Sequence, residues 1–208
     1  MIEVNKLNRC GWAEGSEMYI NYHDKEWGLP VFDDKILFEF LILETAQAGL
    51  SWSTILKRRN NYKEAYDNYD IEKIASYEEA KRTELLNNKG IIRNKLKIDA
   101  SINNAERVLK IQEEYGSFSR YLWSFTVFTP VINKSETLSE VPAETELSKT
   151  IAKNLKKKGF KFVGSVTIYA FLQAVGIVND HLVGCFRYQE VIDYYNKKVK
   201  DVDYLQEI

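Results

Sequence analysis

The sequence contains few of the residues that define several protein classes. Its 208 residues include only two cysteines and two histidines. Two cysteines are too few for the disulfide framework of a small secreted domain. The chain also has only three prolines and ten glycines, with no low-complexity stretch and no internal repeat. This composition excludes collagen-like and repeat proteins and favours a compact, largely helical chain.

Long apolar runs are missing as well. No uninterrupted apolar segment approaches the ~20 residues that span a bilayer. The first six residues, Met-Ile-Glu-Val-Asn-Lys, lack the apolar core of a signal peptide. We therefore expect a cytoplasmic protein that does not bind membranes. A hydrophobic content of 45% and an aromatic content of 13% are enough to bury a core without a covalent staple.

The chain has no excess of positive charge. Its 29 basic and 30 acidic residues give a net charge of −1, so any binding of nucleic acid must depend on a local basic patch. Two clusters are available, residues 57–59 and a set of lysines in the C-terminal third. The ordinary interpretation of either is a solvated helix face. The lysines of the second cluster are Lys153, Lys156, Lys157, Lys158 and Lys161.

All cysteines and histidines fall into two short terminal segments. Twelve residues separate Cys10 from His23, and three separate His181 from Cys185. Each segment thus contributes one thiolate and one imidazole, which together make a closed Cys2His2 ligand set for zinc. A closed tetrahedron leaves no position for a water molecule, so the zinc would be structural and the catalytic groups would lie elsewhere.

Three alternatives to a structural zinc remain open. A Cys10–Cys185 disulfide would leave both histidines unexplained. Two cysteines and two histidines are also few enough to be unrelated core residues. A metallohydrolase would need an open metal position, which four protein ligands disfavour.

Helical periodicity dominates the chain. Between Asp34 and about Gln47 the apolar residues cover nearly the whole helix surface, which predicts a buried helix. Residues 129–142 are predicted to be an exposed loop, and Thr145 to be the N-cap of a later helix. The remaining predicted helices are Trp52–Asn60, Ile71–Ser76, Glu78–Asn87, Arg93–Tyr115, Phe118–Phe125, a helix ending near Lys157, and Ser165 to about Val178.

A short turn bounded by Gly159 and Gly164 joins the last two of these helices. This arrangement resembles a helix-hairpin-helix, which offers backbone N–H groups at a helix N-terminus to DNA phosphates, and Lys161 would add a positive charge there. By spacing alone, an ordinary helical hairpin with Gly159 as a C-cap is the more common interpretation.

Glu44 is the most unusual single residue, because it is a carboxylate on an apolar helical stripe. Burial of an unpaired charge is costly, so Glu44 needs either a salt bridge or a ligand. Aromatic residues that could stack on a flat base lie near it in the sequence. These are Trp12, Tyr19, Tyr22, Trp27 and Trp52.

Several longer motifs, taken together, resemble the type I 3-methyladenine DNA glycosylases from about Asn8 to Tyr188. The matching segments are Arg9-Cys10-Gly11-Trp12, Tyr22 to Gly28, Gln47 to Trp52, Gly90 to Arg93, Trp123 to Phe125, Gly159 to Gly164 and Val178 to His181. The chain departs from the family's usual pattern in having Ala46 before Gln47.

This resemblance implies an all-α helix-hairpin-helix glycosylase fold in which a zinc clasp joins the terminal segments. It implies one glycosylase domain of two intimate helical lobes over residues 1–188, with residues 189–208 as a C-terminal extension. It assigns the four zinc positions to Cys10, His23, His181 and Cys185, and the pocket carboxylate to Glu44. The base-contacting aromatics would be Trp12, Tyr19, Tyr22 and Trp52, and DNA would be contacted by Gln47, Gly49, Leu50, Gly159, Lys161 and Gly164.

The activity implied by the resemblance is hydrolysis of the N-glycosidic bond of 3-methyladenine in alkylated double-stranded DNA. The enzyme would release the free base and leave an abasic site. No lysine is suited to act as a Schiff-base nucleophile, so we expect a monofunctional enzyme, and a monomer suffices. Asp180, next to His181, is expected to orient the zinc clasp and not to act in catalysis. A non-catalytic, zinc-clasped module that binds damaged DNA is the alternative.

Overall fold

The computed structural model describes residues 7–201. Over that range the chain is predominantly helical, with eleven α-helices and a single pair of short strands. It divides into two compact units. The first contains the described parts of residues 1–30, 129–142 and 173–208, and the second contains residues 31–128 and 143–172. No helix within residues 7–201 combines the length and the apolar character needed to span a bilayer.

Helix α2 (Asp34–Gln47) forms the core of the second unit. The side chain of Asp33 accepts a hydrogen bond from the N–H of Ile36 and so caps the helix. Nine residues between Leu37 and Ala46 are buried, Glu44 among them. The predicted nearly all-round burial of this helix is confirmed, except that Ile36 is exposed in its first turn.

Asp34 connects α2 to α8 (Phe118–Ser124). Its carboxylate accepts hydrogen bonds of 2.8 and 2.7 Å from the N–H groups of Phe118 and Ser119. A carboxylate at this position also interacts favourably with the positive end of the α8 dipole. Trp123, on the same helix, is fully buried and donates from its ring N–H to the carbonyl of Val31.

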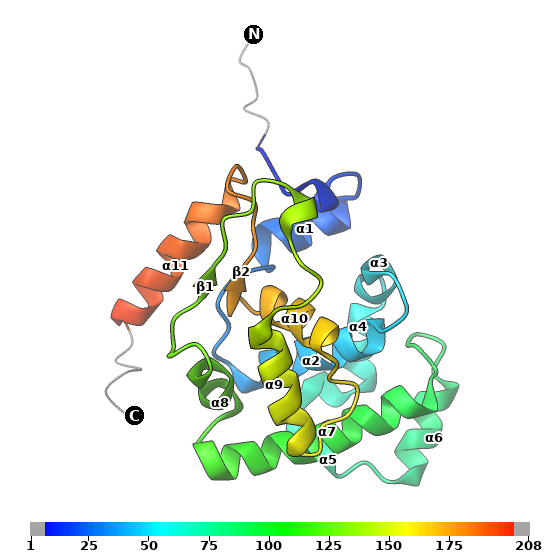
Figure 1. The fold of residues 1–208 in the computed structure, drawn as a ribbon. Coiled ribbons are helices and arrows are strands. Elements are labelled where there is room, and N and C mark those ends of the chain that lie inside the picture. The colour runs from blue at the N-terminus through cyan, green and yellow to red at the C-terminus, as the bar shows by residue number, and fades with distance from the viewer. Residues whose placement is uncertain (1–6, 202–208) are drawn as a thin grey trace. The chain divides into compact units, whose positions relative to one another are not determined.

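Helix α7 (Lys95–Tyr115) is the longest in the described chain, and its residue range confirms the prediction. It begins at the N-cap Asn94 and ends at Gly116, whose φ of 84° few other residues adopt. Figure 1 shows α7 as one continuous helix, and four shorter helices pack against it. These are α2, α5 (Ile71–Ala75), α6 (Glu79–Asn87) and α8.

The predicted single helix from Trp52 to Asn60 was wrong. The chain forms two helices, α3 (Trp52–Leu56) and α4 (Arg59–Ala65). Arg58, with φ of −106° and ψ of 0°, separates them. A short 3-10 helix, Asp67–Tyr69, follows α4 and contains the left-handed residue Asn68.

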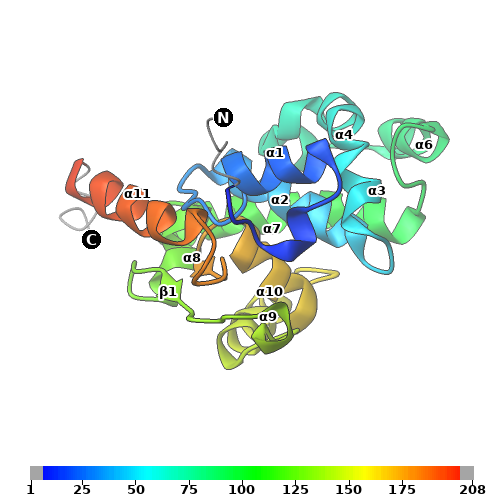
Figure 2. The same cartoon turned by 90° about the horizontal axis from the view of Figure 1, so that it is seen from above.

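Two further helices, α9 (Glu146–Lys157) and α10 (Ser165–Ala174), lie side by side in both views (Figure 1, Figure 2). Thr145 caps α9 as predicted, and the Ser148 hydroxyl accepts a hydrogen bond from the N–H of Thr145, which completes a capping box. Helix α10 ends at Ala174, before the predicted end near Val178, because Val178 belongs to a strand.

The first unit contains the only strands of the described chain. Strand β1 (Val131–Ile132) pairs in parallel with β2 (Val178–Asn179), with Val131 opposite Val178. Residues 129–142 are largely exposed, as predicted, but they are not all loop, because they contain β1 and a 3-10 helix, Leu138–Glu140. The strand pair is a small departure from the expected all-α fold. Two residues are too few to show the alternation by which a strand is predicted.

Three further helical segments complete this unit. The 3-10 helix Gly11–Ala13 and helix α1 (Glu17–Lys25) were not predicted. Helix α11 (Arg187–Asp201) begins two residues before the predicted extension at Gln189, and it buries Val191 and Tyr195. Residues 202–208 of that extension lie outside the described residues, as do residues 1–6.

Candidate functional site

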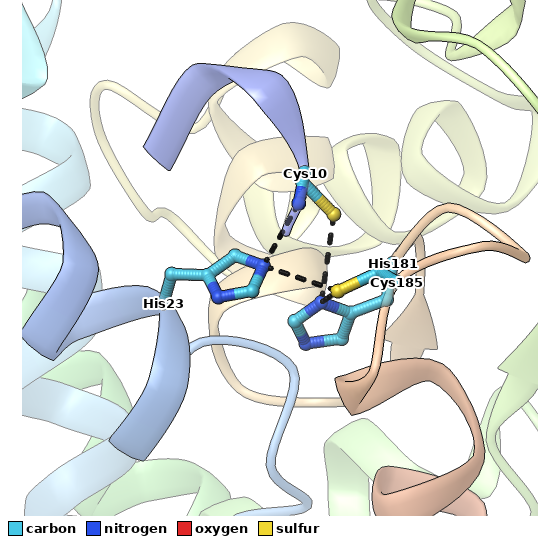
Figure 3. Close-up of side chains that lie close together, drawn as sticks. All are labelled: Cys10, His23, His181 and Cys185. Atoms are coloured by element: carbon cyan, nitrogen blue, oxygen red, sulfur yellow. Dashed lines mark hydrogen bonds between the residues drawn. The ribbon is translucent and has the colours of Figure 1, made fainter. Parts of the chain in front are cut away.

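The two cysteines and two histidines meet in the first unit. Cys10 precedes the first 3-10 helix, His23 lies on α1, and His181 and Cys185 follow β2. One donor atom from each residue lies within 4.8 Å of the other three, and all four side chains are buried. Figure 3 shows the four side chains pointing toward one another. The structure thus brings together the four residues predicted as ligands, and both thiols are free rather than joined in a disulfide.

The spacing of these donors fits a tetrahedral zinc ion. Zn–S bonds of about 2.3 Å and Zn–N bonds of about 2.0 Å place sulfur and nitrogen ligands about 3.6 Å apart in a tetrahedron. The Nδ1 atom of His181 lies 3.7 Å from Cys10 Sγ and 3.6 Å from Cys185 Sγ. The Nε2 atom of His23 lies 3.4 Å from Cys185 Sγ. Two soft thiolates and two imidazoles are also the donor set that zinc prefers.

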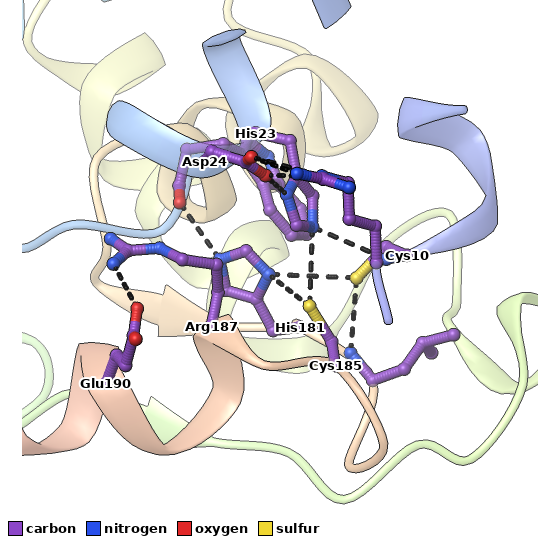
Figure 4. Close-up of polar contacts among 10 residues, drawn as sticks. Cys10, His23, Asp24, His181, Cys185, Arg187 and Glu190 are labelled. Carbon is purple, nitrogen blue, oxygen red and sulfur yellow. Dashed lines mark hydrogen bonds and ion pairs between the residues drawn. The ribbon is translucent and has the colours of Figure 1, made fainter. Parts of the chain in front are cut away.

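The outer nitrogen of each histidine is held by a neighbouring group (Figure 4). His23 Nδ1 lies 2.8 Å from a carboxylate oxygen of Asp24, and His181 Nε2 lies 3.0 Å from the carbonyl oxygen of Trp27. Such contacts fix the ring orientation and select the nitrogen that faces the metal. His23 therefore presents Nε2 to the cluster, and His181 presents Nδ1.

Arg9 holds Asp24 in place. Its guanidinium donates two hydrogen bonds, of 2.9 and 2.7 Å, to the two carboxylate oxygens of Asp24. Burial acts to raise the pKa of Asp24, but hydrogen bonds from Arg9 and then from His23 outweigh burial and lower it. Asp24 therefore stays ionised beside the imidazole that it orients.

The pKa values of the two thiols are shifted in opposite directions. The pKa of Cys185 is lowered, first by a hydrogen bond from the thiol of Cys10 and then by contacts with His181 and His23. The pKa of Cys10 is raised, by its hydrogen bond with Cys185 and by burial. The N–H of Leu182 also donates to Cys10 Sγ at 3.4 Å. Cys185 is therefore the thiol of the pair that favours the thiolate form that a metal requires.

Asp180 was expected to orient the clasp beside its sequence neighbour His181, but its hydrogen bonds lead elsewhere. Its carboxylate accepts hydrogen bonds from Asn133 at 2.6 Å and from Gln173 at 2.7 Å. The outer nitrogen of His181 faces the Trp27 carbonyl instead. Asp180 therefore ties together the chain segments around β1 and β2, and the Trp27 carbonyl, not Asp180, holds His181.

Aromatic rings surround the cluster within the first unit. The ring of Trp12 lies 5.4 Å from His23 and 5.0 Å from Trp27, and the ring of Trp27 lies 4.6 Å from His181. Tyr19 and Tyr22 lie 6.0 and 6.3 Å from Trp12. Of the four predicted base-contacting aromatics, Trp12 thus packs on the cluster, and Tyr19 and Tyr22 pack on Trp12. The fourth, Trp52, begins α3 in the second unit.

Glu44 lies in the second unit, on α2, and is only 5% exposed. Its Oε2 atom has no hydrogen-bond partner within residues 7–201. Burial alone raises the pKa of this carboxyl group from 4.5 to about 8. The salt bridge that would have given Glu44 a structural role is therefore absent from the described chain, and its Oε2 atom is left without a hydrogen bond.

The segment after α2 presents an apolar tip to solvent. Gln47 ends the helix, Gly49 has a φ of 78°, and Leu50 is 39% exposed. The ammonium group of Lys97 donates to the carbonyls of Ala46 and Ala48 at 2.8 and 2.7 Å, and so satisfies the end of α2.

Side chains of α7 hold the turn between α9 and α10 by hydrogen bonds. The side chain of Asn104, which is 2% exposed, donates to the carbonyl of Lys161 at 3.0 Å and accepts from its N–H at 2.8 Å. Asn103 donates to the carbonyl of Gly159 at 2.9 Å. Phe162 takes the left-handed conformation, with a φ of 57°. The N–H groups of residues 162–166 have no acceptor in the described part of the chain.

Comparison with known proteins identifies the family of this chain. The model of the methyladenine glycosylase family matches residues 12–188. The chain belongs to the methyladenine glycosylase family. It is 46% identical to DNA-3-methyladenine glycosylase 1 of Escherichia coli (strain K12), over 88% of this chain and 97% of that protein. It is 45% identical to DNA-3-methyladenine glycosylase of Haemophilus influenzae, over 85% and 96%.

Solved structures of methyladenine glycosylases share the fold. A crystal structure of 3-methyladenine DNA glycosylase I, 46% identical, superposes with a TM-score of 0.84 and covers 86% of this chain and 98% of that one. A variant of such an enzyme in complex with 3-methyladenine, 38% identical, also gives a TM-score of 0.84, over 86% and 97%. The predominantly helical fold expected from the resemblance is thereby confirmed.

Sequence reasoning missed four residues that position groups in this glycosylase. Asp24 could have been identified because it adjoins His23, and carboxylates often orient metal-binding imidazoles. Arg9, Lys97 and Asn104 left no comparable signal, because their partners lie 15, at least 49, and 57 residues away in the sequence.

Proposed function

We propose that this protein is a monofunctional DNA glycosylase that hydrolyses the N-glycosidic bond of 3-methyladenine in alkylated double-stranded DNA. The products would be the free base and an abasic site. Membership of the methyladenine glycosylase family, over residues 12–188, carries this proposal. The enzyme would act in base-excision repair as a cytoplasmic monomer.

Glu44 is the residue to which we assign recognition of the base. Methylation at N3 gives adenine a positive charge, so the base leaves as a neutral molecule and needs little acid catalysis. The task of the enzyme is to bind the flipped cation and to reject neutral adenine. A buried carboxyl group with no partner for Oε2 suits this task, because a cationic base edge would supply the missing hydrogen bond and favour the ionised form.

The aromatic side chains Trp12, Tyr19, Tyr22 and Trp52 would offer ring faces to the flipped base. A cationic base gains more from an aromatic face than a neutral one, because the face of the ring carries negative charge. Attack of water on the sugar carbon then completes the hydrolysis.

Two features of the second unit support DNA binding. The α9–turn–α10 segment would act as a helix-hairpin-helix that binds the phosphate backbone through the N–H groups of residues 162–166, Gly164 among them. Gly159 gives the turn its left-handed residue, with a φ of 87°. The N–H of Lys161 is already bonded to Asn104, so Lys161 would contribute only its side-chain charge. The exposed tip at Gln47, Gly49 and Leu50 would probe the base stack as an apolar wedge.

Cys10, His23, His181 and Cys185 would hold one structural zinc ion. Four protein ligands leave no open position on the metal, so it would stabilise the first unit and take no part in hydrolysis. Because Trp12 and Trp27 pack on the liganding histidines, the cluster would also hold the aromatic residues in place.

The test is chromatography of the bases released from methylated duplex DNA by the purified protein, with Glu44→Gln run in parallel. Release of 3-methyladenine by the native protein, and much slower release by the variant, would support both the activity and the role of Glu44. A folded, zinc-loaded protein that binds the DNA but releases no base would favour the alternative, a non-catalytic module for damaged DNA.

A further inference from the structure

A row of lysines on α9 has no role in the groups described so far. Lys149, Lys153, Lys156 and Lys157 follow one another at intervals of four, three and one residues, which places them along one side of the helix. Together with Ala152 and Ser165 they line an open groove between α9 and the start of α10. All six residues belong to the second unit.

Three of these lysines carry uncompensated charge. No carboxylate in the described part of the chain lies within 4.0 Å of the ammonium groups of Lys153, Lys156 and Lys157. Lys149 differs, because its ammonium group lies 2.8 Å from Glu146 and 3.7 Å from Glu144. The positive charge of the groove is therefore concentrated toward the C-terminal half of α9.

Lys158, at the C-terminal end of the same helix, differs from these three lysines because its charge is paired. Its ammonium group lies 2.7 Å from Glu114 and 4.6 Å from the ring centroid of Tyr115. Those contacts direct its side chain toward α7 and α8, and it does not line the groove. The neighbouring Lys157 has no such partner.

The lysine row does not stabilise α9 itself. Like charges at i, i+3 and i, i+4, such as Lys153 with Lys156 and Lys157, repel one another on a helix. The helix dipole favours cations in the last turn, which accounts for Lys156 and Lys157 but not for Lys153. An external anion would remove the repulsion among all three.

We infer that Lys153, Lys156 and Lys157 form a track for the phosphates of one DNA strand, in addition to the backbone N–H groups of the hairpin. This inference rests on the proposed function. From Lys153 to Lys157 the helix rises about 6 Å. A DNA strand carries one phosphate per ~3.4 Å of helix axis, so about two phosphates face a row of this length. The row supplies three unpaired ammonium groups to meet them.

The experiment measures binding of the full-length protein to a duplex with one non-cleavable abasic analogue, as a function of salt concentration. The variant K153Q/K156Q/K157Q is compared with the native chain. Each phosphate contact contributes about 0.9 to the slope of log K against log salt, so the slope should become shallower by about 2 to 3. From 50 to 200 mM salt, the native protein should then lose about 10- to 40-fold more affinity than the variant.

The control variant is K81Q/K95Q/K158Q, which changes the net charge by the same amount. Its three lysines already form ion pairs of 2.7 or 2.8 Å with Glu84, Asp99 and Glu114. Its salt slope should match that of the native protein. The conservative variant K153R/K156R/K157R should keep the native slope, because arginine retains the charge. Melting curves establish that each variant is folded.

A slope that is unchanged in K153Q/K156Q/K157Q, or that falls equally in both triple variants, would overturn the phosphate track. Release of 3-methyladenine by the native protein, measured on the same preparation, reports on the proposed function separately. If the native protein binds the duplex but releases no base, the proposed function fails, and the comparison of slopes still decides whether the lysine row touches phosphate.

Discussion

Replacement of Glu44 by glutamine should make the protein more stable, and by an amount that depends on pH. In the unfolded chain this carboxyl group ionises near pH 4.5, whereas in the folded chain burial raises its pKa to about 8. Between these values the folded protein holds a proton that the unfolded chain releases. Stability therefore falls as the pH rises through this window.

The size of the effect follows from the two pKa values of Glu44. At pH 5 the folded protein holds the proton and the unfolded chain has only begun to gain from releasing it, so the raised pKa of Glu44 costs under about 1 kcal/mol of unfolding free energy. At pH 8 the cost has grown to about 4 kcal/mol. Glutamine does not ionise, so the stability of Glu44→Gln relative to the native protein should rise by roughly 3 kcal/mol from pH 5 to pH 8.

Urea unfolding followed by tryptophan fluorescence at pH 5, 6, 7 and 8 measures this difference. Glu39→Gln is the matched control, because Glu39 also lies on α2 but forms a 2.6 Å ion pair with Arg59. That variant should lose the ion pair and show no gain that grows with pH. A difference between native and Glu44→Gln proteins that stays constant from pH 5 to pH 8 would refute the reasoning, since Glu44 would then ionise alike in both states.

Three further changes test other parts of the structure. His181→Ala should abolish the bound zinc, measured by elemental analysis, and lower the melting temperature by about 10 °C, which for a chain of this length corresponds to about 4 kcal/mol; full stability without zinc would contradict the clasp. Asn104→Leu removes both hydrogen bonds to Lys161, so it should cost about 2 kcal/mol and weaken DNA binding while leaving the binding of free 3-methyladenine intact; loss of both kinds of binding together would point to general unfolding. Gly176→Val would place a Cβ atom 2.4 Å from the backbone of Leu29 and Pro30, so it should destabilise the folded protein. A variant with native stability would show that this close approach is not rigid.

The sequence by itself determined which residues form the Cys2His2 cluster, because the chain contains no other cysteine or histidine. It also determined the long helices α2 and α7, since their apolar periodicity extends over 14 and 21 residues. The burial of Glu44 followed from its position on an apolar stripe. Short elements could not be predicted from the sequence. The two-residue strands and the break at Arg58 contain too few residues to show a periodic pattern.

Only the tertiary structure decided which groups form hydrogen bonds or ion pairs with the residues of the site. The choice of the Trp27 carbonyl over Asp180 as the partner of His181 depends on how segments 154 residues apart come together. The bonds from Asn104 to the hairpin, and the pairing of Lys158 but not Lys157, are likewise contacts between distant segments. Local sequence fixes the periodicity and chemistry of side chains, whereas the packing of distant segments fixes which of them remain without partners and are free to bind a ligand.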